Sequence, residues 1–272
     1  MTIAPADLEQ AGLRLDIDES SPAGSVATVT LSRPERRNAM TPAMWHGLAA
    51  IGAALPPPVR VVVVRGEGPS FSAGIDLRLF SGAGSGSDAV APGDRLPSAA
   101  DPGFEDWIAQ CQQGYLWLRR PGIVSIAAVQ GHAIGGGFQL ALACDLRILA
   151  DDAKLCMKEP ALGLVPDLTG TKPLADIAGL PRALELCLTA RTVDAAEARE
   201  LRLAESVVPR AELDAAVADL VAALLATDAA TARATKALLQ RAPGSTLEEQ
   251  AAAERRAQGE LQRSRLPAGT AP

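Results

Sequence analysis

The stretch Ala133–Asp145, AIGGGFQLALACD, decides the fold of this chain. Three glycines at 135–137 stand between an apolar run and a segment with the composition of an apolar helix. Glycine at such a junction lets the chain turn sharply and lets a ligand approach the backbone. The first N–H groups of a helix have no partner within it, and they carry the positive end of its dipole. The stretch therefore predicts a strand, a tight turn and a helix that presents N–H donors.

A second segment repeats this order. Residues 61–77, VVVVRGEGPSFSAGIDL, read as a strand, a turn and a glycine before a short polar sequence. Either turn alone is also explained by close packing of a strand against a helix. Two such turns brought together would point a pair of N–H donors at one oxygen, which makes an oxyanion hole. Each donor there contributes roughly 3–4 kcal/mol in the transition state.

Composition and missing motifs exclude several function classes. The chain has 272 residues, a net charge of −6 and a sequence pI of about 5.1, which favours neither nucleic acid nor an anionic membrane as partner. The sequence has no GxxxxGK[ST], no GxGxxG after a strand and no GxSxG, which disfavours nucleotide triphosphates, a Rossmann cofactor and a serine-hydrolase elbow. The N-terminus lacks a basic region followed by an apolar run, and no run of 18 apolar residues occurs. We expect a cytoplasmic protein.

Cysteine and histidine usage predicts no metal centre. Four dispersed cysteines form no CxxC pair and are expected to be buried thiols in a reducing compartment. Only two histidines occur, and His132 in the glycine turn is expected to be a structural imidazole. Asp145 is expected to cap the helix or to pair with Arg147.

Hydrophobic periodicity predicts a β/α region followed by helices. The strands are expected at 26–31, 59–66, 123–129 and 146–150, and the first helices at 42–55 and 104–119. After Pro181 the pattern turns helical, at 182–189, 194–201, 210–225, 231–240 and 246–263. Residues 81–103 are rich in Gly, Ser and Pro and predict a mobile loop. The expected organisation is an α/β core at 1–180, a helical region at 181–265 and a frayed tail at 266–272.

Five separated segments carry a family resemblance. They are LSRPERRNAM (31–40), FSAGIDL (71–77), AAVQGHAIGGGFQLALACDLRILADDAKL (127–155), KEPALGLVPDLTGT (158–171) and LTARTVDAAEARELRLAESVVP (188–209). In this order they resemble the crotonase, or enoyl-CoA hydratase/isomerase, superfamily. The resemblance implies a spiral of ββα units followed by a C-terminal helical trimerisation region. It also implies a CoA thioester as substrate, no separate cofactor and a homotrimer or homohexamer.

The resemblance also implies the binding residues. It places the two oxyanion donors on the backbone N–H groups of Ile75 and Gly136. It implies further CoA-thioester contacts by Arg36, Arg37, Ala73, Gly74, Asp76, Leu77 and Gly135. The guanidinium groups of the two arginines could neutralise the phosphates of CoA, although a solvated charge pair explains them equally well.

The proposed catalytic residues are Gln139, Glu159 and Asp167. The first acid of the hydratases aligns with Gln139, and an amide cannot accept a proton at neutral pH. Glu159 retains the second acid. Asp167 stands where the dienoyl-CoA isomerases, which this segment resembles, carry an acid beside a pair like Lys158-Glu159. Their additional acid, at the Gln139 position, is missing here, but a single glutamate at the Glu159 position can also serve simple Δ3/Δ2 double-bond isomerisation. The resemblance thus favours double-bond isomerisation, with Glu159 and Asp167 transferring the proton.

Other interpretations stay open from the sequence. Asp167 could be only a turn or helix-capping residue, and Glu159 a surface acid before a proline. A catalytically silent acyl-CoA-binding homologue and an ordinary enoyl-CoA hydratase are alternatives. Dehalogenation, hydrolysis or C–C cleavage of an acyl-CoA would use the same pocket with different acids.

Overall fold

The computed structural model describes residues 4–81 and 96–265. Most of the loop predicted at 81–103 lies outside the described residues, and so does the tail at 266–272. Within the described part, residues 96–103 form turns and irregular structure ahead of the next helix.

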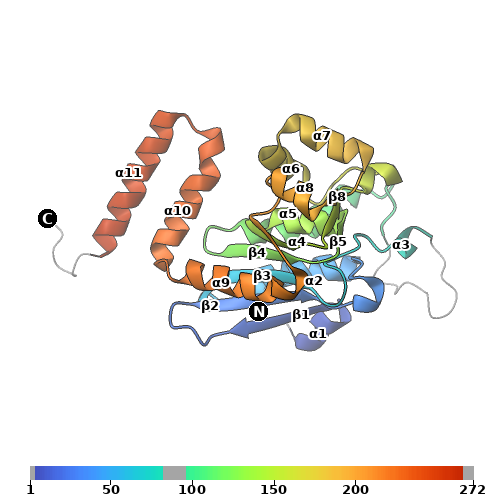
Figure 1. Ribbon diagram of the computed structural model, residues 1–272, viewed down its shortest axis with the longest axis horizontal. Helices are drawn as coiled ribbons and strands as arrows, with labels where there is room; N and C mark the ends of the chain where they lie inside the picture. Colours follow the sequence, from blue (N-terminus) through green and yellow to red (C-terminus); the bar gives the residue numbers. More distant parts are fainter. Residues whose placement is uncertain (1–3, 82–95, 266–272) are drawn as a thin grey trace.

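A six-stranded sheet forms the centre of the molecule, in the order β1-β2-β3-β4-β6-β9 (Figure 1). β1 is antiparallel to β2, and the remaining neighbours are parallel. The strands are β1 (Leu13–Asp18), β2 (Ser25–Leu31), β3 (Val59–Gly66), β4 (Val124–Val129), β6 (Leu146–Ala150) and β9 (Ser206–Val208). A smaller sheet joins β5 (His132–Ile134), β7 (Lys154–Cys156) and β8 (Val193–Asp194).

Helices surround both sheets, and the last of them form a C-terminal helical region. The helices are α1 (Pro5–Gln10), α2 (Pro42–Ala54), α3 (Arg78–Ser81), α4 (Phe104–Leu116), α5 (Gly136–Ala143), α6 (Thr171–Ala178), α7 (Leu180–Thr189), α8 (Ala195–Glu200), α9 (Leu213–Leu225), α10 (Ala229–Arg241) and α11 (Leu247–Ser264). Single 3-10 turns lie at 34–36, 117–119, 159–162, 210–212 and 242–244. The predicted α/β fold class is confirmed.

The continuous valine run in β3 is explained by two separate cores. Val62 and Val64 pack in the larger core with α2, α4 and α5, whereas Val61 and Val63 face the smaller core beneath α9. Successive side chains of a strand point to opposite faces, so a strand covered on both faces needs apolar residues at every position. The central sheet is therefore buried between helices on both faces.

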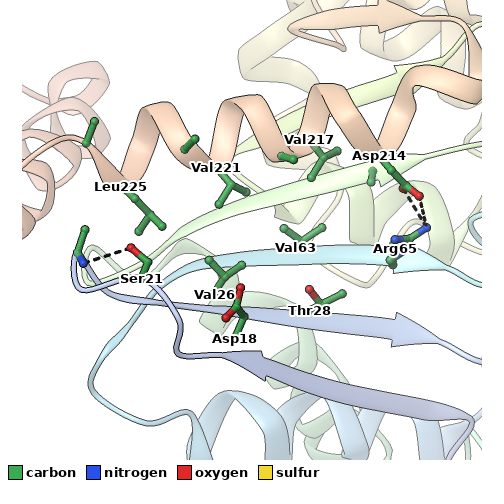
Figure 2. Close-up of a pocket in the computed structure, with 15 residues that line it drawn as sticks. Asp18, Ser21, Val26, Thr28, Val63, Arg65, Asp214, Val217, Val221 and Leu225 are labelled. Carbon is green, nitrogen blue, oxygen red and sulfur yellow. Dashed lines mark hydrogen bonds and ion pairs between the residues drawn. The ribbon is translucent and has the colours of Figure 1, made fainter.

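The face of the sheet beneath α9 contains a cavity of about 560 Å³. Figure 2 shows Val217, Val221 and Leu225 of α9 above Val26 and Val63 of the sheet. The lining also includes the ion pair between Arg65 and Asp214, whose charged atoms lie 3.0 Å apart. None of the residues predicted for catalysis or CoA binding lines this cavity.

The structure differs from the sequence-based expectation in its short strands. β1 and the small sheet were not predicted, and β8 and β9 interrupt the segment expected to be entirely helical after residue 181. These strands have two to six residues, and β9 pairs with β6 through only three of them. β1, LRLDID, does alternate apolar and polar residues, a strand signal that the sequence analysis did not use. The other four have only two or three residues, too few to show a period, so contacts with neighbouring strands decide their conformation.

The expected pairing of Asp145 with Arg147 is wrong. The Asp145 carboxylate accepts hydrogen bonds from Ser125 and lies 2.6 Å from the Lys236 ammonium of α10. Arg147 pairs instead with Glu205, 3.0 Å away. Lys236 reaches Asp145 from α10 and Glu205 reaches Arg147 from the segment before β9, so two distant parts of the chain supply the partners.

Among residues 4–81 and 96–265, no single helix has both the length and the apolar composition needed to cross a membrane. The bent pair Arg210–Leu225 and Ala229–Gly244, whose axes meet at 102°, reaches those values only when the two are taken together.

Candidate active site

The two glycine turns lie side by side in the structure. Ser72 forms a parallel bridge with Ala133: its N–H donates to the His132 carbonyl at 2.8 Å, and its carbonyl accepts from the Ile134 N–H at 3.0 Å. The approach is so close that a Cβ at Gly74 would lie 2.5 Å from the Ile134 carbonyl oxygen. The backbone of Gly74 is also left-handed, at φ +83°. Glycine is therefore required there for both reasons.

The backbone N–H groups of Ile75 and Gly136, the two predicted oxyanion donors, differ in their local structure. Ile75 bridges to Met40 through its neighbours, since the Met40 N–H donates to the Gly74 carbonyl and the Asp76 N–H donates to the Met40 carbonyl. In an extended segment the N–H groups alternate in direction, so the Ile75 N–H points away from Met40. Gly136 is the first residue of α5, where a helix leaves its N–H groups unbonded. Neither amide donates a backbone hydrogen bond to any described residue.

Glu159 begins the 3-10 turn Glu159–Leu162 and is buried, with 8 % of its surface exposed. Its Oε1 accepts a hydrogen bond of 2.6 Å from Gln139, while no described residue donates to its Oε2. The carboxyl lies against Gly135, where an added Cβ would be 3.0 Å from Oε1. Burial raises the pKa of Glu159, and the nearby Asp167 carboxylate raises it further. The interpretation of Glu159 as a surface acid is wrong.

Asp167 lies in the turn before α6 and is partly buried. Burial raises the pKa of this carboxyl too. Its backbone carbonyl accepts a 2.7 Å hydrogen bond from Gln112 of α4, which fixes the turn. The structure thus brings two carboxyl groups from separate segments close enough to influence each other.

Gln139 is fully buried on the first turns of α5. Besides its bond to Glu159, its Oε1 accepts from the N–H groups of Leu168 and Gly170, at 2.9 and 3.1 Å. Its side chain therefore connects Glu159 with the turn that carries Asp167.

The residues predicted to bind CoA near the first glycine turn differ from one another in burial. Asp76 is buried with 6 % exposure, and its carboxylate is bonded to Arg78 at 2.6 Å and to Arg33 at 3.3 Å. The hydrogen bonds from Arg78, with a smaller contribution from Arg33, lower the pKa of Asp76 to about 2. Arg36, Arg37 and Leu77 are exposed, and Ala73 donates its N–H to the Arg37 carbonyl.

Three residues of the site escaped the sequence analysis. Arg33, within the segment LSRPERRNAM, anchors Asp76 and also donates to the Ala39 carbonyl. Tyr115 of α4 is fully buried and donates to the Gly136 carbonyl at 3.2 Å, next to the second oxyanion donor. Gly170, in PDLTGT, makes room for Gln139, whose Cγ would be 2.6 Å from a Cβ there. The motifs contained Arg33 and Gly170, but nothing in the sequence singled them out.

The sequence also led to predictions about His132 and about metal binding. His132 is exposed, and its Nδ1 lies 3.3 Å from the Ser70 hydroxyl. In the described part of the chain, no three His, Cys, Asp or Glu side chains are grouped so that they could hold a metal ion.

Comparison with known proteins adds independent information. A family model described as enoyl-CoA hydratase/isomerase matches residues 22–266. A probable enoyl-CoA hydratase of Mycobacterium tuberculosis, echA8, is 31% identical over 233 residues, which cover 85% of this chain and 84% of the relative. The peroxisomal Delta(3,5)-Delta(2,4)-dienoyl-CoA isomerase of Arabidopsis thaliana is 31% identical over 242 residues, covering 86% and 84%.

A solved structure is more similar still. A proposed enoyl-CoA hydratase from Thermobifida fusca YX, crystallised in complex with CoA, is 59% identical, with a TM-score of 0.89 and coverage of 97% of this chain and 98% of that one. A proposed enoyl-CoA hydratase of the same organism was also crystallised with acetoacetyl-CoA. The fold and the sequence therefore lead to the same group of proteins.

Proposed function

The chain belongs to the enoyl-CoA hydratase/isomerase family, and from that premise we propose that it isomerises the C=C bond of an unsaturated acyl-CoA in preference to hydrating it. The CoA-bound Thermobifida fusca structures support a CoA thioester as the ligand. Ala73–Leu77 and Gly135 would line the thioester path, and the exposed Arg36 and Arg37 would approach the phosphates.

The N–H groups of Ile75 and Gly136 would bind the thioester oxygen. When a proton leaves Cα of a 3-enoyl-CoA, its bonding electrons move into the C=O group and form an enolate. Two fixed N–H donors stabilise the negative oxygen without reorganisation, and such electrostatic stabilisation usually lowers the barrier more than any other single effect. The absence of a backbone acceptor for either amide among the described residues supports this assignment.

Glu159, through its unpartnered Oε2, would remove the proton, and the pair formed with Asp167 would return one at Cγ. The new double bond is then conjugated with the thioester, and no atom is gained or lost. Burial raises the pKa of both carboxyl groups, which makes each a better proton acceptor than an exposed carboxylate. General acid–base catalysis works best with pKa values near the working pH.

One observation carries the preference for isomerisation, namely the bonding of Gln139. In the hydratases that this chain resembles, two acidic side chains together bind the water molecule that is added. Here the first position has an amide whose oxygen is already occupied by two backbone N–H groups. It cannot accept a proton from a water molecule. Migration of a double bond needs no water.

Hydration stays the second candidate because Glu159 and Asp167 form a different pair of acids in the same site. Several relatives are also named as hydratases. A silent acyl-CoA-binding protein is the third candidate, and it would keep the N–H donors while lacking turnover.

A substrate panel separates these functions. Purified protein is mixed with 2-enoyl-, 3-enoyl- and dienoyl-CoA thioesters while ultraviolet absorbance records gain, loss or migration of conjugation. We expect the 3-enoyl or dienoyl thioester to react fastest. Faster loss of conjugation from 2-enoyl-CoA would contradict isomerisation and support hydration. Binding of all three without reaction would support the silent homologue.

Glu159→Gln tests the assigned base in the same assay. The amide keeps the shape of the side chain but cannot take a proton, so turnover should fall about 100- to 10,000-fold. Affinity for a CoA thioester, measured by calorimetry, should change less than about threefold. Wild-type turnover in this variant would remove Glu159 from the mechanism.

We further propose a homotrimer or homohexamer that uses no cofactor beyond the CoA of its substrate. The exposed Leu239 and Leu247 on the α10–α11 pair support self-association, because large apolar side chains on a projecting helix pair favour burial (Figure 1). Light scattering after gel filtration measures the mass of the assembly. A monomer at micromolar concentration would contradict the proposal.

A further inference from the structure

We infer that Gln139 is a positioning residue, which holds the Glu159 carboxyl in register with the Asp167 turn and leaves Oε2 alone to face the substrate. This inference deepens the proposed function and rests on it. It replaces the assignment of Gln139 as a catalytic group with an indirect role that acts through Glu159.

The hydrogen bonds fix the orientation of the amide. Two backbone N–H groups, of Leu168 and Gly170, point at Oε1 from 2.9 and 3.1 Å. Backbone N–H groups can only donate, so the atom they meet must be the oxygen. The opposite end, Nε2, consequently donates to Glu159 Oε1 at 2.6 Å. Only an uncharged side chain with a donor at one end and an acceptor at the other satisfies all three bonds.

The surrounding backbone is shaped for this side chain. A Cβ at Gly170 would lie 2.6 Å from Cγ and 3.0 Å from Oε1 of Gln139. A Cβ at Gly135 would lie 3.0 Å from Glu159 Oε1. Two glycines from different segments therefore leave space for the Gln139–Glu159 contact. Close packing of this kind restricts both side chains to one arrangement.

The consequence for Glu159 is a division between its two oxygens. Oε1 is occupied by Gln139, whereas Oε2 is buried with no donor among the described residues. A substrate C–H group would thus meet a single, fixed basic atom. A catalytic group held in one geometry by its neighbours gains more than a mobile one, and a displacement of about 1 Å can cost about 100-fold in rate.

Other titratable groups surround the same carboxyl and must be counted in any pH experiment. Asp167 approaches it from the turn, Tyr115 from α4, Cys156 from β7 and Cys187 from α7. Lys158 precedes it in the chain. A substitution at position 139 leaves all of these groups in the chain but can move Asp167, whose turn Gln139 holds. A control variant that loosens the same turn is therefore needed.

Gln139→Glu is the decisive variant because it is isosteric. One oxygen of the new carboxyl would keep the two backbone donors, and the other would face Glu159 Oε1 across the former hydrogen bond. Two carboxyl groups at that distance share one proton. We expect kcat at pH 7 to fall more than about tenfold and KM to change less than about threefold. The acid limb of the pH–rate profile should move upward by about one unit or more, with activity regained at higher pH.

Two further variants separate positioning from structure. Gln139→Met keeps the length of the side chain but removes all three hydrogen bonds, so kcat should fall at every pH with no recovery in alkali. Gln112→Met removes a hydrogen bond to the same turn, on the Asp167 carbonyl, without touching Glu159. The acid limb of this control should stay at its wild-type position.

The inference and the proposed function fail in different ways. A Gln139→Glu profile that superimposes on the wild-type profile, or an effect confined to KM, would overturn the positioning role. Full activity of Glu159→Gln would overturn the proposed function instead. Infrared difference spectra of wild type against Glu159→Gln titrate the Glu159 carboxyl without turnover. The same spectra are recorded for Gln139→Glu against the double variant Gln139→Glu/Glu159→Gln. They must show an upward shift in the pKa of the Glu159 carboxyl, whichever reaction the substrate panel identifies.

Discussion

Two buried carboxyl groups stand beside the two glycine turns, and their environments have opposite effects. Asp76 follows the first turn and is 6 % exposed, and Glu159 lies against the second turn and is 8 % exposed. The pKa of Asp76 is lowered to about 2, whereas that of Glu159 is raised. Both side chains are little exposed, but Glu159 lies deeper in the protein, so the depth of burial and the hydrogen-bond partners together give the opposite charge preferences.

The partners differ in charge. Asp76 accepts from the guanidinium groups of Arg78 and Arg33, which stabilise its ionised form more than burial disfavours it. Glu159 accepts from a neutral amide and has an acidic neighbour, so that burial dominates. The first environment keeps a permanent anion that ties the loop to the segment before α2. The second keeps a carboxyl that can gain and lose a proton.

Among the tests of the contrast between Asp76 and Glu159, Gly135→Ala should have the largest effect. The new methyl group would press on the Glu159 carboxyl, and the backbone at φ +50° and ψ −121° disfavours any residue but glycine. We expect turnover to fall about 100-fold. Gly179→Ala is the matched control, because its φ is +77° and nothing lies within 4 Å of the added Cβ. Equal losses in both variants would mean that backbone strain, and not the carboxyl, explains the effect.

The next test removes one arginine from Asp76. Arg33→Met leaves the buried carboxylate with Arg78 alone and also loses the hydrogen bond to the Ala39 carbonyl. The free energy of unfolding in urea should drop by about 2 kcal/mol at pH 7, because hydrogen bonds to a charged donor are lost while Arg78 still pairs with Asp76. Arg14→Met, which breaks exposed pairs with Asp16 and Glu67, should cost less than about 0.5 kcal/mol. Similar costs for both would show that the Asp76 contact is no stronger than a surface ion pair.

The pH dependence of stability sharpens the comparison further. The pKa of Asp76 is lowered in the folded state, so the carboxylate stabilises the fold above pH 3.8, and this contribution is lost as pH falls toward 2. The advantage of wild type over Asp76→Asn should therefore shrink by up to about 2 kcal/mol between pH 6 and pH 2. A constant difference for Asp76→Asn would contradict its lowered pKa.

For Glu159 the pH dependence of stability should have the opposite sign to that for Asp76, and the effect should be the smallest of these predictions. Its folded-state pKa is raised, so the folded protein binds the proton more tightly than the unfolded chain does. Wild type should gain stability relative to Glu159→Gln as pH falls from neutrality toward 4.5, and no further below it. Thermal unfolding of both proteins over this range measures the difference. A gain for wild type with rising pH would reverse the sign and contradict the raised pKa.

Much of the fold follows from local patterns in the chain. The run at 59–66 and the strand at 146–150 occur as predicted, because each is rich in branched aliphatic residues and is bounded by turn residues. The caps at Thr41, Asp194 and Thr246 accept from the N–H groups of their helices, so local chemistry sets those helix starts. β1 alternates apolar and polar residues and pairs with β2, the next strand in the chain, so its signal was also local. The strands of the small sheet lacked such signals, and they depend on pairing between segments about 20 to 40 residues apart.

The site divides in the same manner. Its glycines, Gln139, Glu159 and Asp167 could be selected from the sequence, because residue type and motif order are properties of the chain itself. Which oxygen of Glu159 is free, and that Arg33 joins the neighbouring Arg78 at Asp76, could not be selected. Those answers depend on contacts between residues 20 to 43 positions apart.

The sequence by itself determined the α/β class, the two glycine turns and the types of residues that surround them, since these depend on local periodicity and on backbone chemistry. Only the tertiary structure decided that the turns touch through Ser72 and Ala133, that Gln139 holds Glu159, and that the two acids have opposite pKa shifts. The physical reason is that a carboxyl group's charge depends on which donors reach it, and packing of distant segments selects those donors.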